Sequence, residues 1–439
     1  MYRDLTRGSI SRSLLLFALP MIAGNLLQQF YNIADTLIVG RALGSEALAA
    51  VGSAYTLMTF LTSIFLGLSM GSGALFSIYR GRGDESSLRL GIVHAFGLIL
   101  CVTLMLNAAV YLFLEPILRF LQVPESVAPG MQEYLLIIFA GLLATSLYNY
   151  LSCLLRALGN STVPLVFLAV SAMLNIGLDL LFVLVFHWGI AGAAWATVIA
   201  QYMSGVGILW FFLAKCKHLL PKKKELHYDR AILKDIFQLS SLTCVQQSVM
   251  NFGILMVQGL VNSFGATVMA AFAAAVKIDS FAYMPVQDFG NAFSTYVAQN
   301  YGAGETDRIK KGIRSAGLCS AVFCVCISVL VCAFASPLMS IFIDPGESAI
   351  IAAGVHYLRI EDACYIGIGI LFLLYGYYRA VNQPQMSVVL TIASLGTRVA
   401  LAYLLSATPL GVTGIWLSVP IGWALADAIG IGYYLKKKR

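Results

Sequence analysis

Long apolar stretches, each bounded by charged or turn-forming residues, follow one another along almost the whole chain. An α-helix rises 1.5 Å per residue, so about 20 apolar residues cross the hydrocarbon core of a bilayer. Twelve stretches of this length predict twelve membrane-spanning helices. Their expected limits are 13–39, 47–78, 88–118, 132–156, 163–186, 190–214, 236–263, 267–300, 311–336, 352–379, 385–406 and 411–435.

Composition agrees with a polytopic membrane protein. Of 439 residues, 59% are hydrophobic and 11% are charged, whereas soluble domains carry about 25% charged residues. Mean hydropathy is +0.83. The net charge of +7 does not indicate a nucleic-acid partner, because the basic residues lie in short loops rather than on one face or arm.

The distribution of Lys and Arg predicts the orientation. Of these 28 residues, 23 lie in the termini and alternate loops of one side, while the opposite loops hold Arg41 and Arg119. The positive-inside rule then places both termini in the cytoplasm of a bacterial cell, with the chain in its plasma membrane. Residues 215–235, the longest polar stretch, are expected to form a cytoplasmic linker between an N-lobe (1–214) and a C-lobe (236–439) of six helices each.

The two halves repeat. A shift of 221 residues pairs Gly44 with Gly265 and Gly81-Arg-Gly83-Asp84 with Gly302-Ala-Gly304-Glu305. Similar shifts pair Arg156-Ala157 with Arg379-Ala380, and Gly189-x-x-Gly192 with Gly411-x-x-Gly414. An even number of spans per half gives both halves the same orientation. The sequence therefore predicts a parallel repeat about an axis along the membrane normal, typical of transporters with a site near the midplane.

The first span carries a polar stripe of Gln28, Tyr31, Asn32 and Asp35, spaced so that all four share one helix face. A carboxylate inside the bilayer costs several kcal/mol, roughly 2.5–3.5 on insertion scales, and usually serves a function. Asp35 is therefore a candidate cation or proton site, although a structural ion pair with Arg41 is also compatible with the sequence. Pro20 removes one backbone hydrogen bond and permits a kink.

The fifth and sixth spans supply further oxygen ligands. Asn175 and Asp179 lie one turn apart on one face, and Thr197 follows in the next span. With Asp35 these side chains offer only hard oxygen donors, which suit Na⁺, while two buried carboxylates together also suit a proton carrier. Tyr134 and Asn149 in the fourth span could complete the polar wall. A structural hydrogen bond between helices is the alternative for Asp179.

The second half lacks an equivalent set of acids. Its first span has Gln246 and Gln247, and Glu361 and Asp362 lie in the outer half of its fourth span. The spacing favours a local ion pair between Arg359 and Asp362. Arg398 and Asp427 are expected to form an interhelical or interfacial pair. The sequence does not assign roles to these charged side chains: Lys277, Asp288, Glu361, Asp362, Arg398 and Asp427.

The remaining reactive residues do not form a catalytic pattern. Nine Cys are scattered through mostly apolar segments, where Cys behaves as a small hydrophobe, and the five His form no ligand cluster. We therefore expect neither an enzyme nor a bound cofactor, and no metal beyond a possible Na⁺ at Asp35, Asn175, Asp179 and Thr197. A single-bundle pore is disfavoured as well, because no charged ring or carbonyl filter is apparent.

The chain resembles a known family, the multidrug and toxic compound extrusion (MATE) transporters, in their bacterial DinF/MepA-like branch. The resemblance covers nearly the whole chain. Its segments are Pro20, Gln28–Gly40, Ala47–Gly52, Arg156–Asn160, Asn175-x-x-x-Asp179, Gly189–Thr197 and Gln299–Gly304.

The resemblance implies an all-α fold of two six-helix lobes and an antiporter that exports cationic amphipathic compounds against H⁺ or Na⁺ by alternating access. It implies that Asp35, Asn175, Asp179 and Thr197 form the cation site. Gln28, Tyr31, Tyr134 and Asn149 would lie near the substrate cavity, and the first helix would bend at Pro20. The expected partners are small organic cations and the lipid bilayer, with no obligate protein partner. A sodium site in the C-lobe is less expected here.

One alternative is a flippase or exporter of lipid-linked precursors from the related superfamily. Such a protein would need a cationic cavity for pyrophosphate, whereas the expected N-lobe site is acidic. The sequence leaves the physiological substrate, the coupling ion and the oligomeric state open.

Overall fold

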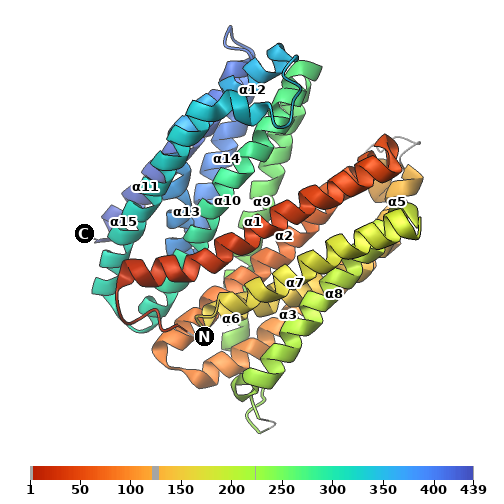
Figure 1. Ribbon diagram of the computed structural model, residues 1–439. Coiled ribbons are helices and arrows are strands. Elements are labelled where there is room, and N and C mark those ends of the chain that lie inside the picture. The colour runs from red at the N-terminus through yellow and green to blue at the C-terminus, as the bar shows by residue number, and fades with distance from the viewer. Residues whose placement is uncertain (1–2, 121–127, 223, 439) are drawn as a thin grey trace. The chain divides into compact units, whose positions relative to one another are not determined.

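The structure, a computed structural model, describes residues 3–120, 128–222 and 224–438, and every regular element within these ranges is a helix (Figure 1). The helices of the first half are α1 (Ile10–Leu43), α2 (Ser45–Arg82), α3 (Glu85–Leu112), α4 (Leu114–Phe120), α5 (Ala128–Ile138), η1 (Phe139–Gly141), α6 (Leu142–Ala157), α7 (Thr162–Asp179), η2 (Leu180–Val185), α8 (Gly189–Lys215) and η3 (Lys217–Leu219). Those of the second half are α9 (Arg230–Asn262), α10 (Ala266–Gly302), α11 (Thr306–Met339), α12 (Ser348–Glu361), η4 (Asp362–Cys364), α13 (Tyr365–Ala380), α14 (Pro384–Ser406) and α15 (Val412–Lys438).

Eleven helical stretches in the described ranges are long and apolar enough to cross a membrane. The twelfth expected span, 352–379, is built as α12, η4 and α13. In this stretch α12 ends at Glu361, a 3₁₀ turn covers Asp362–Cys364, and α13 begins at Tyr365. Short 3₁₀ pieces within a long helix often mark a functional or strained position.

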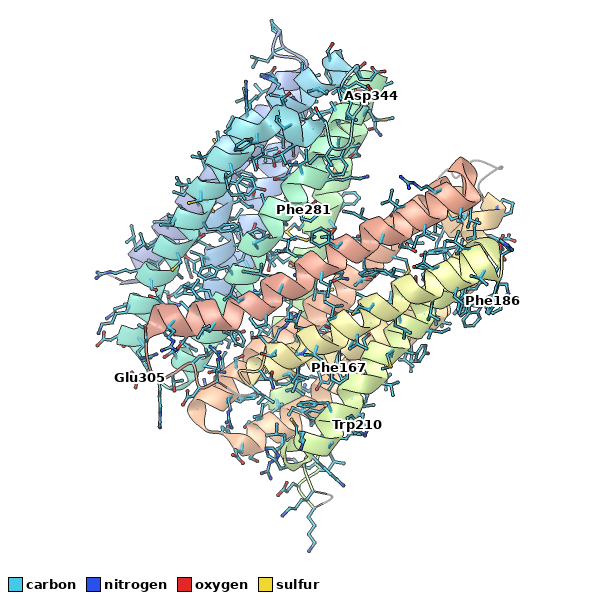
Figure 2. The ribbon with its side chains drawn as sticks, in the orientation of Figure 1. Phe167, Phe186, Trp210, Phe281, Glu305 and Asp344 are labelled. Atoms are coloured by element: carbon cyan, nitrogen blue, oxygen red, sulfur yellow. The ribbon has the colours of Figure 1, made fainter. Side chains whose placement is uncertain are left out.

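The surface of α11 illustrates the membrane environment. No charged residue occurs between Ser315 and Ile343, a run bounded by Arg314 and Asp344. Large apolar side chains at i, i+4, i+7 and i+11 are exposed along one face: Leu318, Val322, Val325 and Val329. In the first half of the chain, Trp210 on α8 is 70% exposed and Phe186 is 49% exposed (Figure 2). Such apolar faces are stable against lipid but not against water.

The turns confirm the internal repeat. Gly83 and Gly304 follow α2 and α10 with φ of +70° and +74°, a left-handed conformation that glycine adopts without strain. In each case the next residue donates its N–H to a carbonyl five residues back: Asp84 to Tyr79 at 3.1 Å and Glu305 to Asn300 at 2.9 Å. This is the Schellman pattern of helix termination.

Two further pairs of turns match between the halves. After α6, Gly159 has φ of +88°, and after α13 the equivalent residue is Asn382, with φ of +59°. Gly189 and Gly411, which precede or open the last long helix of each half, also have positive φ. The expected all-α fold of two repeated six-helix lobes is confirmed.

The chain divides into two compact units. Unit 1 contains Arg3 and Leu19–Cys244, and unit 2 contains Asp4–Ala18 and the chain from Val245 onward. The division therefore falls inside α1 and inside α9 rather than in the polar linker. The first nine residues of α1 belong to unit 2 and the rest to unit 1. In α9 the first part, up to Cys244, belongs to unit 1 and the rest to unit 2.

Close packing in unit 1 explains why the first part of α9 belongs there. A Cβ atom on Gly67 would lie 2.4 Å from Cys244 Cα, and one on Gly71 would lie 2.5 Å from Ser240 Cα. These glycines let α2 and α9 approach backbone to backbone, as small residues do between membrane helices. The Ser72 and Ser240 hydroxyls add a hydrogen bond of 2.9 Å.

A candidate cation site in unit 1

Two carboxylates meet inside unit 1. Asp35 lies on α1, and Asp179 is the last residue of α7. Asp179 is fully buried, and the two carboxyl groups lie within hydrogen-bonding range of each other. Each retains a buried oxygen, Oδ1, that has no hydrogen-bond partner among the described residues. Two carboxylates at this separation repel unless a proton or a cation lies between them, so the pair is suited to hold one.

Asn175, one turn before Asp179 on α7, and Thr197, on the adjacent helix α8, lie beside the pair. In the orientation that satisfies both ends of its amide, Asn175 donates to Asp179 Oδ2 at 3.2 Å and accepts from the Thr197 N–H at 3.3 Å. The Thr197 hydroxyl donates to the Ala193 carbonyl one turn earlier on α8, at 3.0 Å. Asn175 thus links Asp179 to the backbone of Thr197.

Two tyrosines border the same group. Tyr134 on α5 is buried and lies close to the Thr197 side chain and to both carboxyl groups. Tyr31, one turn before Asp35 on α1, lies within electrostatic range of Asp35 and Asp179. The structure thus brings together six of the predicted residues: Tyr31, Asp35, Tyr134, Asn175, Asp179 and Thr197.

The backbone changes form directly after Asp179. Residues Leu180–Val185 make a π-helical turn, η2, rather than continuing the α-helix. Such turns release backbone carbonyls from regular pairing and are frequent at functional sites. The following turn packs tightly, because a Cβ atom on Gly192 would lie 3.2 Å from the Phe182 backbone carbon. No sequence pattern predicted this π-helical turn.

The other predicted site residues lie elsewhere on the same helices. Asn149 donates to the Thr145 carbonyl of its own helix at 2.9 Å. Gln28 is half buried on α1, two turns before Asp35. Pro20 lies within α1 and directly follows the point where that helix passes from unit 2 to unit 1.

Unit 2 contains a second acidic cluster, which the sequence did not predict as a group. Asp279 on α10 accepts a hydrogen bond from the Tyr365 hydroxyl. Glu361 and Asp362 are 3% and 0% exposed, and electrostatic interactions link both to Asp279. Arg398 on α14 supplies positive charge near Asp279 and Glu361.

Two expected ion pairs are corrected by this arrangement. Asp362 does not pair with Arg359 within 4 Å in the described structure, because Asp362 is fully buried while Arg359 is exposed. Nor does Asp427 pair with Arg398 within 4 Å in that part of the chain. The charge of Arg398 instead acts on Asp279 and Glu361. Asp427 instead lies near Gly367, whose Cβ position would be 3.7 Å from Asp427 Oδ2.

The described residues contain no group of three or more His, Cys, Asp or Glu arranged to hold a metal ion. The donors of the unit 1 site are two carboxylates, one amide and one hydroxyl, all with oxygen atoms. Oxygen donors of this kind suit a proton or a hard cation rather than a transition metal.

Comparison with known proteins identifies the family. The MatE family model matches residues 20–181 and 243–404, one match in each half of the chain. A Bacillus subtilis protein named "Probable multidrug resistance protein YpnP" is 32% identical over 98% of this chain and 96% of its own length. A second B. subtilis protein, "Probable multidrug resistance protein YoeA", is 29% identical over 98% of this chain and 94% of its own.

Among solved structures, one described as "Crystal structure of MATE in complex with MaL6" superposes with a TM-score of 0.93 over 99% of this chain and 97% of its own, at 21% identity. The fold, the duplicated match and the identity to relatives agree with the resemblance seen in the sequence. The chain therefore belongs to the MatE family, whose members are multidrug and toxic compound extrusion transporters and not enzymes.

Proposed function

We propose that this protein is an antiporter that exports cationic amphipathic compounds in exchange for H⁺ or Na⁺. The observation that carries the proposal is the juxtaposition of Asp35 and Asp179 in unit 1, with Asn175 and Thr197 beside them. Two carboxylates in a membrane-embedded unit are costly unless a cation or proton neutralises them. The names of the related B. subtilis proteins support multidrug compounds as the cargo.

The proposed mechanism is competition for the carboxylates. In the outward-facing state, a coupling ion binds at Asp35 and Asp179, removes the negative charge and thereby weakens the attraction for a cationic substrate. The substrate leaves, the protein returns to the inward-facing state, and loss of the ion restores the charge. A ligand shifts a conformational equilibrium only by its differential affinity for the two states, so the carboxyl pair is where that difference arises.

The neighbouring residues have supporting roles in this scheme. Asn175 holds the carboxyl group of Asp179 in place and is itself held by the Thr197 N–H, while the Thr197 hydroxyl adds a polar oxygen beside the ion. Tyr31 and Tyr134 present aromatic surface beside a negative site, a combination that suits flat organic cations. Gln28 and Asn149 extend the polar lining. Pro20 allows α1 to bend when the charge at Asp35 changes, and no cofactor is required.

We further propose that both termini are cytoplasmic, following the distribution of Lys and Arg. The N-lobe and C-lobe would alternate between inward- and outward-facing states, as in other transporters with parallel repeats. No obligate protein partner is needed, because the two lobes themselves supply the moving interface.

Reconstitution into proteoliposomes tests the proposal. Uptake of ethidium, a fluorescent organic cation, is followed under an imposed pH gradient and, separately, under an imposed Na⁺ gradient. Wild-type protein should accumulate ethidium under one gradient, which also identifies the ion. Asp35→Asn and Asp179→Asn should each abolish the accumulation.

The matched control is Asp344→Asn, an exposed acid after α11 whose Oδ1 accepts the Gly346 N–H, a bond that Asn preserves. It should transport like wild type. Correctly inserted wild-type protein that is silent under both gradients would refute the antiporter and favour an exporter of lipid-linked precursors.

A further inference from the structure

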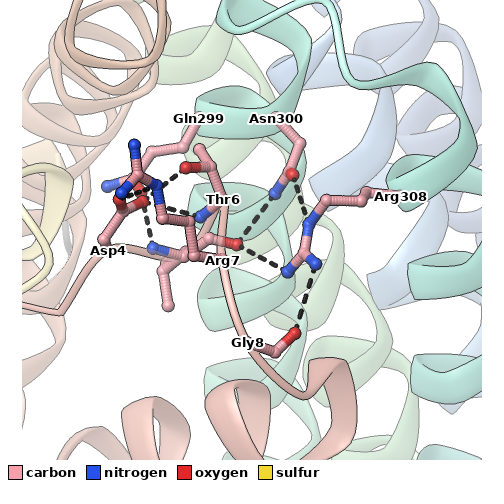
Figure 3. A network of polar contacts seen from close by, with 8 residues as sticks. Asp4, Thr6, Arg7, Gly8, Gln299, Asn300 and Arg308 are labelled. Carbon is pink, nitrogen blue, oxygen red and sulfur yellow. Dashed lines mark hydrogen bonds and ion pairs between the residues drawn. The ribbon is translucent and has the colours of Figure 1, made fainter.

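The segment before α1 is held in unit 2 by a polar clamp, which we define as Gln299, Asn300 and Arg308 (Figure 3). The Leu5 N–H donates to Gln299 Oε1 at 3.2 Å, and the Leu5 carbonyl accepts from Asn300 Nδ2 at 3.2 Å. Arg308 donates to the Leu5 and Gly8 carbonyls at 3.4 and 3.2 Å. Three side chains thus hold the backbone of a four-residue stretch.

The clamp is organised independently of the segment. Arg308 Nε donates to Asn300 Oδ1 at 3.1 Å, which fixes the guanidinium plane relative to the amide. Asn300 also donates to the Tyr296 carbonyl of its own helix at 2.8 Å. The planar fork of Arg suits two carbonyl acceptors in a way that the single ammonium of Lys does not.

The segment itself has a shape that suits the clamp. Leu5 is fully buried, whereas Arg7 is largely exposed and lies 3.5 Å from Asp4 in an ion pair. Gly8 has φ of +75°, so it can turn the chain directly into α1. In the first turn of α1, the Ser11 hydroxyl lies 2.8 Å from that of Ser315 on α11.

This attachment ends where α1 can bend. Residues 10–18 belong to unit 2 with the clamp, and residues 19–43, including Asp35, belong to unit 1. Pro20 has no N–H to donate to the Leu16 carbonyl, so the helix lacks one backbone hydrogen bond just past the division. The helix therefore has a fixed end in one unit, a weakened turn, and an ion-binding end in the other.

A corresponding attachment precedes α9 in unit 1. The Asp229 N–H donates to His94 Nε2 at 3.2 Å. Glu225 forms an ion pair with Arg89 at 3.5 Å. His94 and Arg89 both lie on α3. The helix α9 then passes to unit 2 at Val245. Under the repeat, α3 corresponds to α11 and α9 corresponds to α1, so each half fastens the start of the helix that continues into the other unit.

We propose that Arg308 is a positioning residue for transport: with Gln299 and Asn300 it fixes residues 5–8 in unit 2, so that an ion-driven change in α1 is expressed beyond Pro20 rather than lost by movement of the whole helix. This inference rests on the proposed antiport function. It assigns a role to the segment Gln299–Gly304, whose first two residues are clamp residues.

The test combines hydrogen–deuterium exchange with transport kinetics on the full-length protein. Arg308→Ala removes the bonds to Leu5 and Gly8, so backbone amides of residues 5–12 should exchange at least about tenfold faster. The maximal rate of gradient-driven ethidium transport should fall several-fold, while the half-saturating ethidium concentration stays unchanged. Arg308→Lys should give an intermediate exchange rate and an intermediate transport rate, because a single ammonium retains part of the contact.

A second variant tests the same contact by changing the bound segment instead of the clamp. Leu5→Asn places a polar amide in a buried position and should reproduce the effects of Arg308→Ala. The matched controls are Arg7→Asn on the same segment and Lys310→Ala on α11, since both side chains pair only with exposed acids. Both controls should match wild type in exchange and in rate, and thermal unfolding should show all variants folded.

The outcomes separate the two proposals. Faster exchange of residues 5–12 with an unchanged transport rate would overturn the positioning role, and so would a lower rate without faster exchange. Failure of the antiport proposal would appear differently, as wild-type protein that transports under neither gradient, and it would remove the basis for this inference as well.

Discussion

Asp179 ends α7 with its carboxyl group directed at that of Asp35, on a helix more than 130 positions earlier in the sequence. Because the two groups face each other, they form one binding unit rather than two independent sites. A proton or cation held by either carboxyl group changes the electrostatic field at the other.

The pair should therefore behave non-additively. If Asp35→Asn and Asp179→Asn each remove coupled transport, the double variant should be no worse than either single variant, because residues that act as a unit contribute jointly. Measurement of ethidium accumulation by the two single variants and the double variant checks this. A double variant that loses a further factor, with the two losses multiplying, would show two independent sites.

A sequence reading could find this site because its signals are local. Asn175 and Asp179 share a helix face at a fixed spacing, and Asp35 interrupts an apolar run, so each stands out without knowledge of the fold. Helix spacing also predicted Tyr31 on the face of Asp35. The meeting of three separate helices followed from the resemblance and not from the spacing.

The unit 2 cluster was not predicted, because its partners depend on how each helix is rotated in the packed structure. Arg398 and Asp427 were expected to pair, yet Arg398 lies near Asp279 and Glu361. Similarly, Arg359 has the right spacing for Asp362 but faces outward. Sequence spacing fixes neighbours within a helix and leaves neighbours between helices open.

The turn after α6 should tolerate only glycine at position 159. A Cβ atom there would lie 2.0 Å from the Arg3 carbonyl oxygen, and φ is +88°. Gly159→Ala should lower the melting temperature of the purified protein more than Gly83→Ala does. At Gly83 the backbone is also left-handed, but no atom lies within 4 Å of the added methyl. Gly83→Ala is therefore the control, which should lose only the free energy of placing alanine in a left-handed conformation, about 1–2 kcal/mol.

Displacement of Arg3 is the expected structural consequence at Gly159. The Arg3 N–H donates to the Gly159 carbonyl at 3.0 Å. In Gly159→Ala, but not in Gly83→Ala, the Arg3 amide should therefore exchange its hydrogen faster. Equal melting temperatures for the two alanine variants would contradict the close contact.

The start of α3 should depend on pH through Asp84. Its carboxylate accepts from Ser87, with the backbone N–H at 3.0 Å, and these hydrogen bonds lower the pKa of Asp84, assisted by the charge of Arg82. A lowered pKa means that the cap stabilises the folded state above the unfolded value of about 3.9. This stability is lost as the pH falls through the folded pKa.

Asp84→Ala should therefore destabilise the protein by about 1 kcal/mol at pH 7, a typical value for an N-cap. The difference from wild type should shrink at acidic pH, where wild-type Asp84 becomes protonated. Thermal unfolding at a series of pH values measures both effects. Asp84→Asn is the matched control, since it keeps a side-chain acceptor and should show a smaller loss without this pH dependence.

The buried acids of unit 2 should make Arg398 important for stability. Glu361 is buried, and Arg398 is a positive charge that acts on both Glu361 and Asp279. Arg398→Ala removes this positive charge and should lower the melting temperature, because buried carboxylates are costly without a compensating charge. Glu361→Gln in the same protein should recover part of that loss, so the double variant should melt above Arg398→Ala.

The control is Arg359→Ala, which removes an exposed arginine on α12 and should change the melting temperature little. If Arg359→Ala were the more damaging change, Arg359 rather than Arg398 would be the arginine that compensates these acids.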